Sequence, residues 1–125
     1  MYKNMFCSVM YKKEFPDFEL DVELPERMID SSWHNNTMPS WRYYRFPIEI
    51  WIDYKDEEQR EMQGKRFSLV VLGPFDEDSG SLITSIRGQT ENWKELLSWY
   101  YQWLRSFYRI EIENDKSPST ASFWD

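Results

Sequence analysis

The segment TENWKELLSWYYQWLRSFYR, residues 90–109, constrains the fold more than any other part of the chain. Its apolar residues recur every three or four positions, which places them on one face of a helix with 3.6 residues per turn. These residues are Trp93, Leu97, Tyr100, Leu104 and Phe107. Asn92 precedes Glu95 by three positions, the spacing of a capping box at a helix N-terminus. The sequence therefore predicts an amphipathic helix that covers a core.

Three aromatic residues of this segment, Trp99, Tyr101 and Trp103, lie outside that apolar face. Either the helix is buried on more than one side, or these rings present their polar tips to water. Alternatively, Trp99 and Trp103 form a second apolar strip that meets a partner chain. In that case they are candidate interface residues.

Most of the remaining chain predicts β-strands. Residues 18–24 strictly alternate apolar and acidic side chains, as a strand with one buried face does. Other runs are rich in branched and aromatic residues and have turn residues at their ends. The expected strands cover residues 2–12, 18–24, 43–54, 66–72 and 81–87, and the first two are expected to form a hairpin.

Consecutive strands that short turns connect pair antiparallel. The predicted fold class is therefore α+β. We expect a single two-layer domain at residues 1–113, in which an antiparallel sheet of about five strands carries one long C-terminal helix packed across one face. Residues 109–113 are either a short strand or the frayed end of the helix, and residues 114–125 are expected to be a mostly flexible tail.

The charge balance limits the classes of partner. The chain has 15 basic and 22 acidic residues, a net charge of −7 at pH 7. Direct nucleic-acid binding is not expected, because a phosphate backbone requires concentrated Lys and Arg. No window holds the ~20 apolar residues of a membrane span, so no membrane partner is expected. Cys7 is the only cysteine, which excludes an internal disulfide and favours a cytoplasmic location.

The irregular stretch at residues 26–42 is rich in Ser, Asn and Thr. A loop this long in a small domain is either functional or packed by its own side chains. In the first case it is a recognition loop with tryptophan anchors and polar contacts between them. The candidate binding residues are Trp33, His34, Asn35, Asn36 and Trp41. In the second case the asparagines cap turns and the tryptophans fill the core.

Few residues are suited to catalysis. A zinc site needs several His or Cys ligands, and the sequence offers only His34 and Cys7, so neither a metal nor another cofactor is expected. Asp17, Asp53 and Lys55 are the residue types of a Mg²⁺-dependent nuclease or hydrolase core. An acidic chain suits DNA poorly, which weighs against that chemistry.

These observations favour a small acidic, aromatic-rich cytoplasmic protein that acts by protein–protein contact rather than by catalysis. Its partner is another protein or a second copy of the chain, which would make it a homodimer. Two alternatives stay open. One is a metal-dependent nuclease or hydrolase that uses Asp17, Asp53 and Lys55. The other is an inhibitor whose acidic surface imitates nucleic-acid phosphates, although interspersed Lys and Arg interrupt a continuous negative strip.

Overall fold

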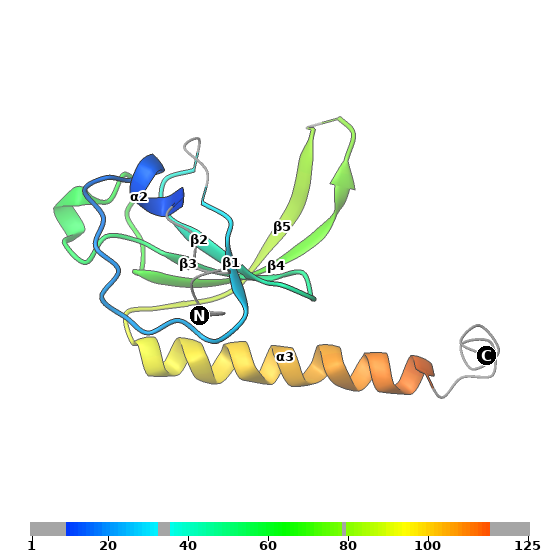
Figure 1. The fold of residues 1–125 in the computed structure, drawn as a ribbon. Helices are drawn as coiled ribbons and strands as arrows, with labels where there is room; N and C mark the ends of the chain where they lie inside the picture. Colours follow the sequence, from blue (N-terminus) through cyan, green and yellow to red (C-terminus); the bar gives the residue numbers. More distant parts are fainter. Residues whose placement is uncertain (1–9, 33–35, 79, 116–125) are drawn as a thin grey trace.

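The computed structural model describes residues 10–32, 36–78 and 80–115, which form a sheet with a long helix across one face (Figure 1). The sheet has five strands in sequential order, and every neighbouring pair is antiparallel. The strands are β1 (Met28–Asp30), β2 (Ser40–Tyr43), β3 (Ile48–Ile52), β4 (Phe67–Asp76) and β5 (Ser81–Thr90). The helices are α2 (Met10–Glu14), the short 3₁₀ helix η1 (Glu57–Gln59) and α3 (Trp93–Asp115). The predicted α+β fold, a single domain with one antiparallel sheet and a long C-terminal helix, is confirmed.

The core lies between the sheet and α3. The strand register places Trp41, Ile50 and Leu69 side by side on β2, β3 and β4, and all three are almost completely buried. Leu96 and Tyr100 of α3 are also fully buried and belong to the same cluster. The apolar face that predicted the helix therefore packs on the sheet, as expected for an amphipathic helix.

α3 begins where the capping signal predicts. The Oδ1 atom of Asn92 accepts hydrogen bonds from the backbone N–H groups of Lys94 at 3.0 Å and Glu95 at 3.2 Å, as an N-cap residue does. The helix then continues to Asp115, so residues 109–113 are helical rather than a strand. Its 23 residues span roughly 34 Å. Figure 1 shows the C-terminal part of α3 extending beyond the sheet.

The prediction of the first two strands is wrong. Residues 10–14 form α2 instead of the end of a strand at 2–12, of which residues 2–9 lie outside the described part. Residues 18–24 are extended and alternate in exposure as expected, but they belong to no strand of the sheet. Their apolar side chains pack against the core. The alternation in the sequence therefore indicated one buried face and not a pairing partner.

β1 and most of β2 lie in residues 26–42, the stretch predicted to be irregular. β1 and β2 pair antiparallel there, and residues 31–39 connect them, of which 33–35 lie outside the described part. The buried carboxylate of Asp30 accepts hydrogen bonds from the backbone N–H groups of Tyr11 at 2.9 Å and Ser32 at 3.0 Å. It thus satisfies two backbone donors and holds α2 against β1.

The connection between β3 and β4 is closed at its base. The backbone N–H of Asp53 donates to the carbonyl of Arg66 at 2.8 Å. Inside the connection, the side chain of Arg60 donates to three backbone carbonyls, those of Tyr54 (2.7 Å), Lys55 (3.3 Å) and Gly64 (3.0 Å). It also binds the carboxylate of Glu91 at 3.1 Å. One guanidinium therefore ties this loop together and joins it to the segment that precedes α3.

Gly88 of β5 lies against α3, and a side chain at this position is expected to destabilise the fold. A Cβ atom on Gly88 would lie 2.7 Å from Cε3 of Trp99, much closer than two nonbonded carbon atoms approach. We expect Gly88→Ala to lower the free energy of unfolding by about 1–3 kcal/mol, because overpacking displaces the indole or the strand. Urea denaturation followed by circular dichroism measures the change.

Gly64→Ala is the matched control for this substitution. Nothing lies within 4 Å of a Cβ atom at Gly64, and its φ is not among the positive values of the described residues. The free energy of unfolding of this variant is expected to stay within about 0.5 kcal/mol of the parent. Equal losses in the two variants would contradict the close contact between Gly88 and Trp99.

Candidate functional site

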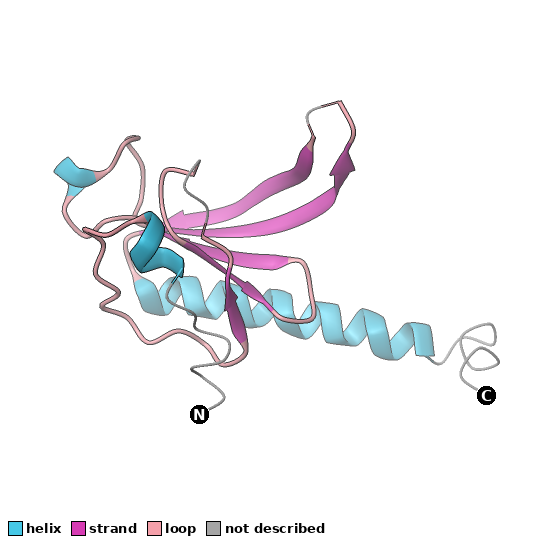
Figure 2. Cartoon of the chain, turned by 45° about the horizontal axis from the view of Figure 1, so that its top comes forward, coloured by secondary structure: helices cyan, strands magenta, loops and turns pink. Residues whose placement is uncertain are grey.

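Two parts of the fold project from the core. β3 pairs with β4 only over residues 67–71, so the distal parts of β4 and β5 continue as a two-stranded hairpin that rises away from the sheet (Figure 1, Figure 2). In both views α3 continues past the sheet in a different direction. An isolated two-stranded hairpin is only marginally stable in water. The projecting hairpin is therefore a place where further contacts would stabilise the fold.

The outer edge of β5 has no strand neighbour among the described residues, because β5 is the last strand of the sheet. On this strand Ile83 and Ile86 expose 52% and 61% of their surface. The unpaired backbone N–H and C=O groups of an edge strand are a template for pairing with another chain. Residues 83–86 thus combine exposed apolar side chains with the hydrogen-bonding groups of an edge strand.

One side of α3 continues this surface. Trp99 packs against Gly88 of β5, and the guanidinium of Arg87 lies over Trp103, 5.1 Å from the ring centroid. Ile110 follows Trp103 by seven positions, which returns it to the same side of a helix, and it exposes 54% of its surface. We call the outer edge of β5 together with Trp99, Trp103 and Ile110 of α3 the β5 flank.

The predicted interface residues Trp99 and Trp103 therefore lie on the β5 flank, where contacts within the chain half-bury them. Part of their surface supports the fold, and the most exposed apolar groups of the flank are isoleucines that the sequence analysis did not single out. A signal for them existed. The run SLITSI at residues 81–86 contains no charged residue and no proline, which is unusual for an exposed edge strand.

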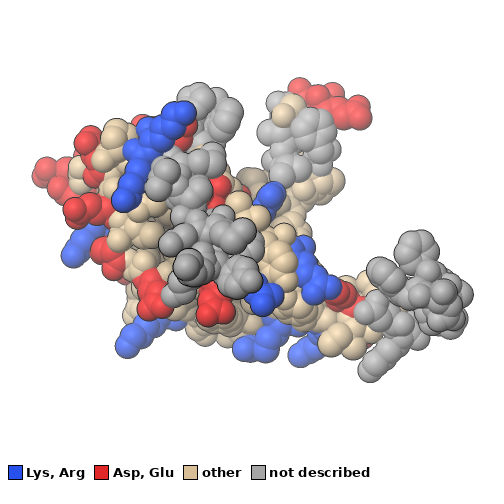
Figure 3. Space-filling view, in the orientation of Figure 1, with Lys and Arg blue, Asp and Glu red and all other residues tan. Residues whose placement is uncertain are grey.

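The charges on the hairpin are arranged asymmetrically. Arg87 is the only charged residue of β5, whereas Asp76 ends β4 and Glu77 and Asp78 follow it in the turn to β5. The carboxylate of Asp76 accepts a hydrogen bond from the backbone N–H of Asp78 at 3.1 Å, and its carbonyl accepts from Gly80 at 2.9 Å. Figure 3 shows these acidic residues gathered at the tip of the hairpin. The hairpin is thus negative at its tip and positive near its base.

No protein family, curated protein or solved structure matches this chain. Within the described residues, no helix combines the length and the apolar character that crossing a membrane requires. A function for this chain therefore has to follow from its own residues and their chemistry.

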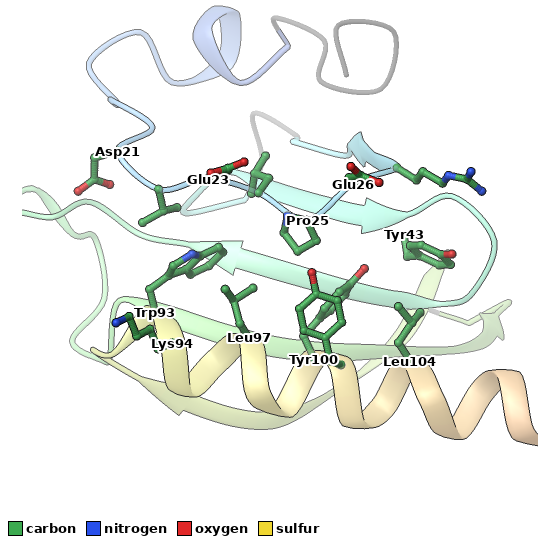
Figure 4. A pocket seen from close by; sticks show the side chains of 14 residues that line it. Asp21, Glu23, Pro25, Glu26, Tyr43, Trp93, Lys94, Leu97, Tyr100 and Leu104 are labelled. Atoms are coloured by element: carbon green, nitrogen blue, oxygen red, sulfur yellow. The ribbon is translucent and has the colours of Figure 1, made fainter. Parts of the chain in front are cut away.

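A groove of about 850 Å³ separates α3 from the extended segment at residues 21–27. Figure 4 shows Leu97, Tyr100 and Leu104 rising from α3 toward that segment, whose acidic residues lie along the rim. The Tyr100 hydroxyl donates to the sulfur of Met28 at 3.2 Å, and burial raises the pKa of Tyr100 well above its usual range. This hydroxyl therefore stays protonated at neutral pH. The groove thus combines apolar side chains of α3 with acidic side chains of the extended segment.

The residues of the nuclease or hydrolase alternative are only partly brought together. Asp17 and Lys55 line one depression beside η1, but Asp53 is not among the residues that line it. Asp53 is buried, its Oδ1 accepts the backbone N–H of Tyr54 at 2.8 Å, and burial raises the pKa of its carboxyl group. Residues 10–32, 36–78 and 80–115 contain no group of three or more His, Cys, Asp or Glu that could hold a metal ion.

The predicted recognition loop is described only in part. Three of its candidate residues lie outside the described part of the chain: Trp33, His34 and Asn35. Asn36 is half-buried at the border of that gap. Trp41 lies on β2 and is completely buried, so no partner reaches its ring in this fold. For Trp41, the alternative in which the tryptophan fills the core holds.

The view in Figure 3 also bears on the phosphate-mimic alternative. On the face shown, Lys and Arg side chains lie between the acidic groups over most of the molecule. A nucleic-acid mimic requires a continuous negative strip that repeats the phosphate spacing. The tip of the hairpin is acidic, but on this face it is separate from the acids around η1.

Proposed function

We propose that this chain is a protein-interaction module that catalyses no reaction and binds its partner through the β5 flank. The observation that carries the proposal is a strand edge that has no neighbour among the described residues and exposes Ile83 and Ile86, continued by exposed Ile110 on α3. Exposed apolar side chains beside free backbone groups are the chemistry by which one protein adds a strand to the sheet of another.

The contacts behind the β5 flank support this role. Trp99 fills the space above Gly88, and Arg87 lies on Trp103, so strand and helix hold one another in a fixed arrangement. A surface that is fixed before binding loses less conformational entropy when a partner arrives. We also propose a cytoplasmic location, because the single cysteine Cys7 suits a reducing compartment.

Site-specific photo-crosslinking tests the proposal. A photoreactive amino acid is placed at Ile86 or at Ile110 of the full chain, which is then produced in the cells of origin and irradiated. We expect covalent adducts with one defined protein from both positions. The adducts are resolved by electrophoresis and their composition is determined by mass spectrometry.

Met62 is the matched control position. Met62 is apolar and exposes 64% of its surface, similar to Ile86 and Ile110. It follows η1, the short green helix at the far left of Figure 1. Adducts at 86 and 110 without adducts at 62 support binding through the β5 flank. Equal adducts from all three positions, or none from 86 and 110, overturn the proposal.

A further inference from the structure

We propose that the partner of the β5 flank is a second copy of this chain, joined by antiparallel pairing of the two β5 strands into one continuous sheet. This inference rests on the function proposed above, since it uses the same surface, and it names the occupant. An isologous contact of this kind requires that the surface be complementary to itself after a two-fold rotation. The edge of β5, the charges of the hairpin and the position of α3 each meet that requirement.

The two edges of the projecting hairpin differ in how well they are protected. Its β4 edge carries Pro74, which has no N–H to donate, and the charged Asp76. Both are devices that keep an edge strand from pairing. Its β5 edge has no proline and no charged residue over residues 81–86. The first charged residue along β5 is Arg87, at the bulge where the β4–β5 register shifts. The free edge of β5 is therefore the one suited to a partner strand.

The charges of the hairpin become complementary when two copies pair antiparallel. With the two-fold axis at Thr84, Ser81 of one copy lies opposite Arg87 of the other, because 84 is midway between them. Ser81 is paired within its own chain with Asp76 of β4, and the acidic turn residues Glu77 and Asp78 follow. Each Arg87 therefore comes within reach of the acidic hairpin turn of the other copy, and the symmetry makes this contact twice.

This charge pattern also explains how two acidic chains can meet. Two molecules of net charge −7 repel each other over most approaches. The β5 strand carries no carboxylate and one cation, so approach along the β5 flank avoids that repulsion and uses the acids of the hairpin turns as partners. Complementary charges of this kind select one partner and one register.

α3 enlarges the contact beyond the paired strands. The helix lies against β3, β4 and β5 on one face of the sheet, so a two-fold axis perpendicular to the sheet places both helices on the same face of the joined sheet. Because Gly88 and Arg87 at the base of β5 contact Trp99 and Trp103 of α3, antiparallel pairing brings the hairpin turn of each copy beside this side of α3 in the other. A stable interface buries about 1,200–2,000 Å², which two short edge strands alone do not supply. The contact of each hairpin turn with α3 of the other copy provides the additional buried area.

Sedimentation equilibrium of the full-length chain over a range of concentrations tests this inference. We expect the parent to be a dimer. Arg87→Glu is expected to weaken self-association at least about tenfold, because it places acids against the partner's acidic turn. The double substitution Glu77→Lys/Asp78→Lys is expected to do the same by placing cations against Arg87. Combining all three substitutions reverses both charges, and dimerisation is expected to recover.

Met62→Lys is the control for a charge added on an exposed apolar residue outside the interface, and it is expected to leave the dimer intact. Circular dichroism and thermal unfolding confirm that each variant keeps the parent fold. A monomeric parent at all concentrations overturns the homodimer, as does an Arg87→Glu chain that dimerises like the parent. If flank-specific crosslinks to a different protein are found with a monomeric parent, the proposed function stands and only the second copy is excluded. If neither dimer nor crosslink is found, both proposals are wrong.

Discussion

Trp41→Ala is expected to lower the free energy of unfolding by about 3–5 kcal/mol, as a tryptophan truncated inside a core does. The ring is completely buried. It contacts Tyr11 at 5.4 Å and Phe18 at 6.5 Å between ring centroids, and it lies opposite Ile50 in the strand register. Removing it leaves a cavity where the sheet, α2 and the N-terminal extended segment meet. Urea denaturation followed by far-ultraviolet circular dichroism measures the loss.

Trp41→Phe is the control that separates packing from a polar role of the indole. The Nε1 atom of Trp41 is buried and has no hydrogen-bond partner among the described residues. Phenylalanine keeps most of the apolar contact and removes that donor, so a loss of only about 1–2 kcal/mol is expected. An unchanged free energy of unfolding in Trp41→Ala would contradict the packing of this ring in the core.

Arg66→Met is expected to cost about 2–4 kcal/mol of unfolding free energy, because it removes a buried network. The guanidinium of Arg66 is almost fully buried and lies 4.9 Å above the ring of Phe67. Its Nε donates to the carbonyl of Asp53 at 3.1 Å, and its terminal nitrogens bind both carboxylate oxygens of Asp21 at 2.5 and 3.2 Å. Methionine fills similar space but leaves the buried carbonyl without a donor. Asp21 is partly exposed and can be rehydrated, which limits the loss.

Arg45→Met makes the same substitution at an exposed ion pair. Arg45 pairs with Glu111 of α3, and both side chains are substantially exposed. A surface pair is screened by water and contributes little, so the loss of stability is expected to be much smaller than for Arg66→Met. Both variants are compared by urea denaturation under identical conditions. Losses of similar size would show that burial does not decide the contribution of these arginines.

The difference in stability between the parent and Arg66→Met is expected to depend on pH. The hydrogen bond from Arg66 holds the pKa of Asp21 below its usual value. The folded chain therefore keeps this carboxylate ionised at a pH where the unfolded chain, with a pKa of about 3.9, takes up a proton. The stabilisation is complete above that value and is lost as the pH falls through the lower folded pKa. The gap between the two urea midpoints should shrink on acidification, and a constant gap would contradict the role of Asp21.

The helix could be predicted from sequence because its signals are local. Asn92 and the apolar periodicity act within a few residues of one another, and the structure shows both the cap and the buried face where they were expected. Residues 18–24 misled the prediction because strict alternation reports burial on one side and contains no information about a pairing strand. In the structure this segment packs against α3 and the core and does not pair with a strand.

The candidate site could be predicted only in part, because it depends on contacts between distant elements. The surplus of aromatic residues drew attention to Trp99 and Trp103, but only the fold shows that Gly88 and Arg87 of β5 pack on them. Trp41 stands beside Ser40 in a polar stretch of sequence, and its burial follows from the register of β2 with β3, which no local pattern encodes.

Residues 54–65 branch off the hairpin of β3 and β4 as a loop. The hydrogen bond between Asp53 and Arg66 closes this loop at its base, so β3 and β4 are already joined there. The entropy lost on closing such a branch rises only slowly with its length, so the sheet places little restriction on how long it is. Arg60 fastens the beginning of the branch to Gly64, which leaves the tip near Met62 as the place where added sequence disturbs least. A fluorescent protein inserted there would label the chain and leave the outer edge of β5 accessible.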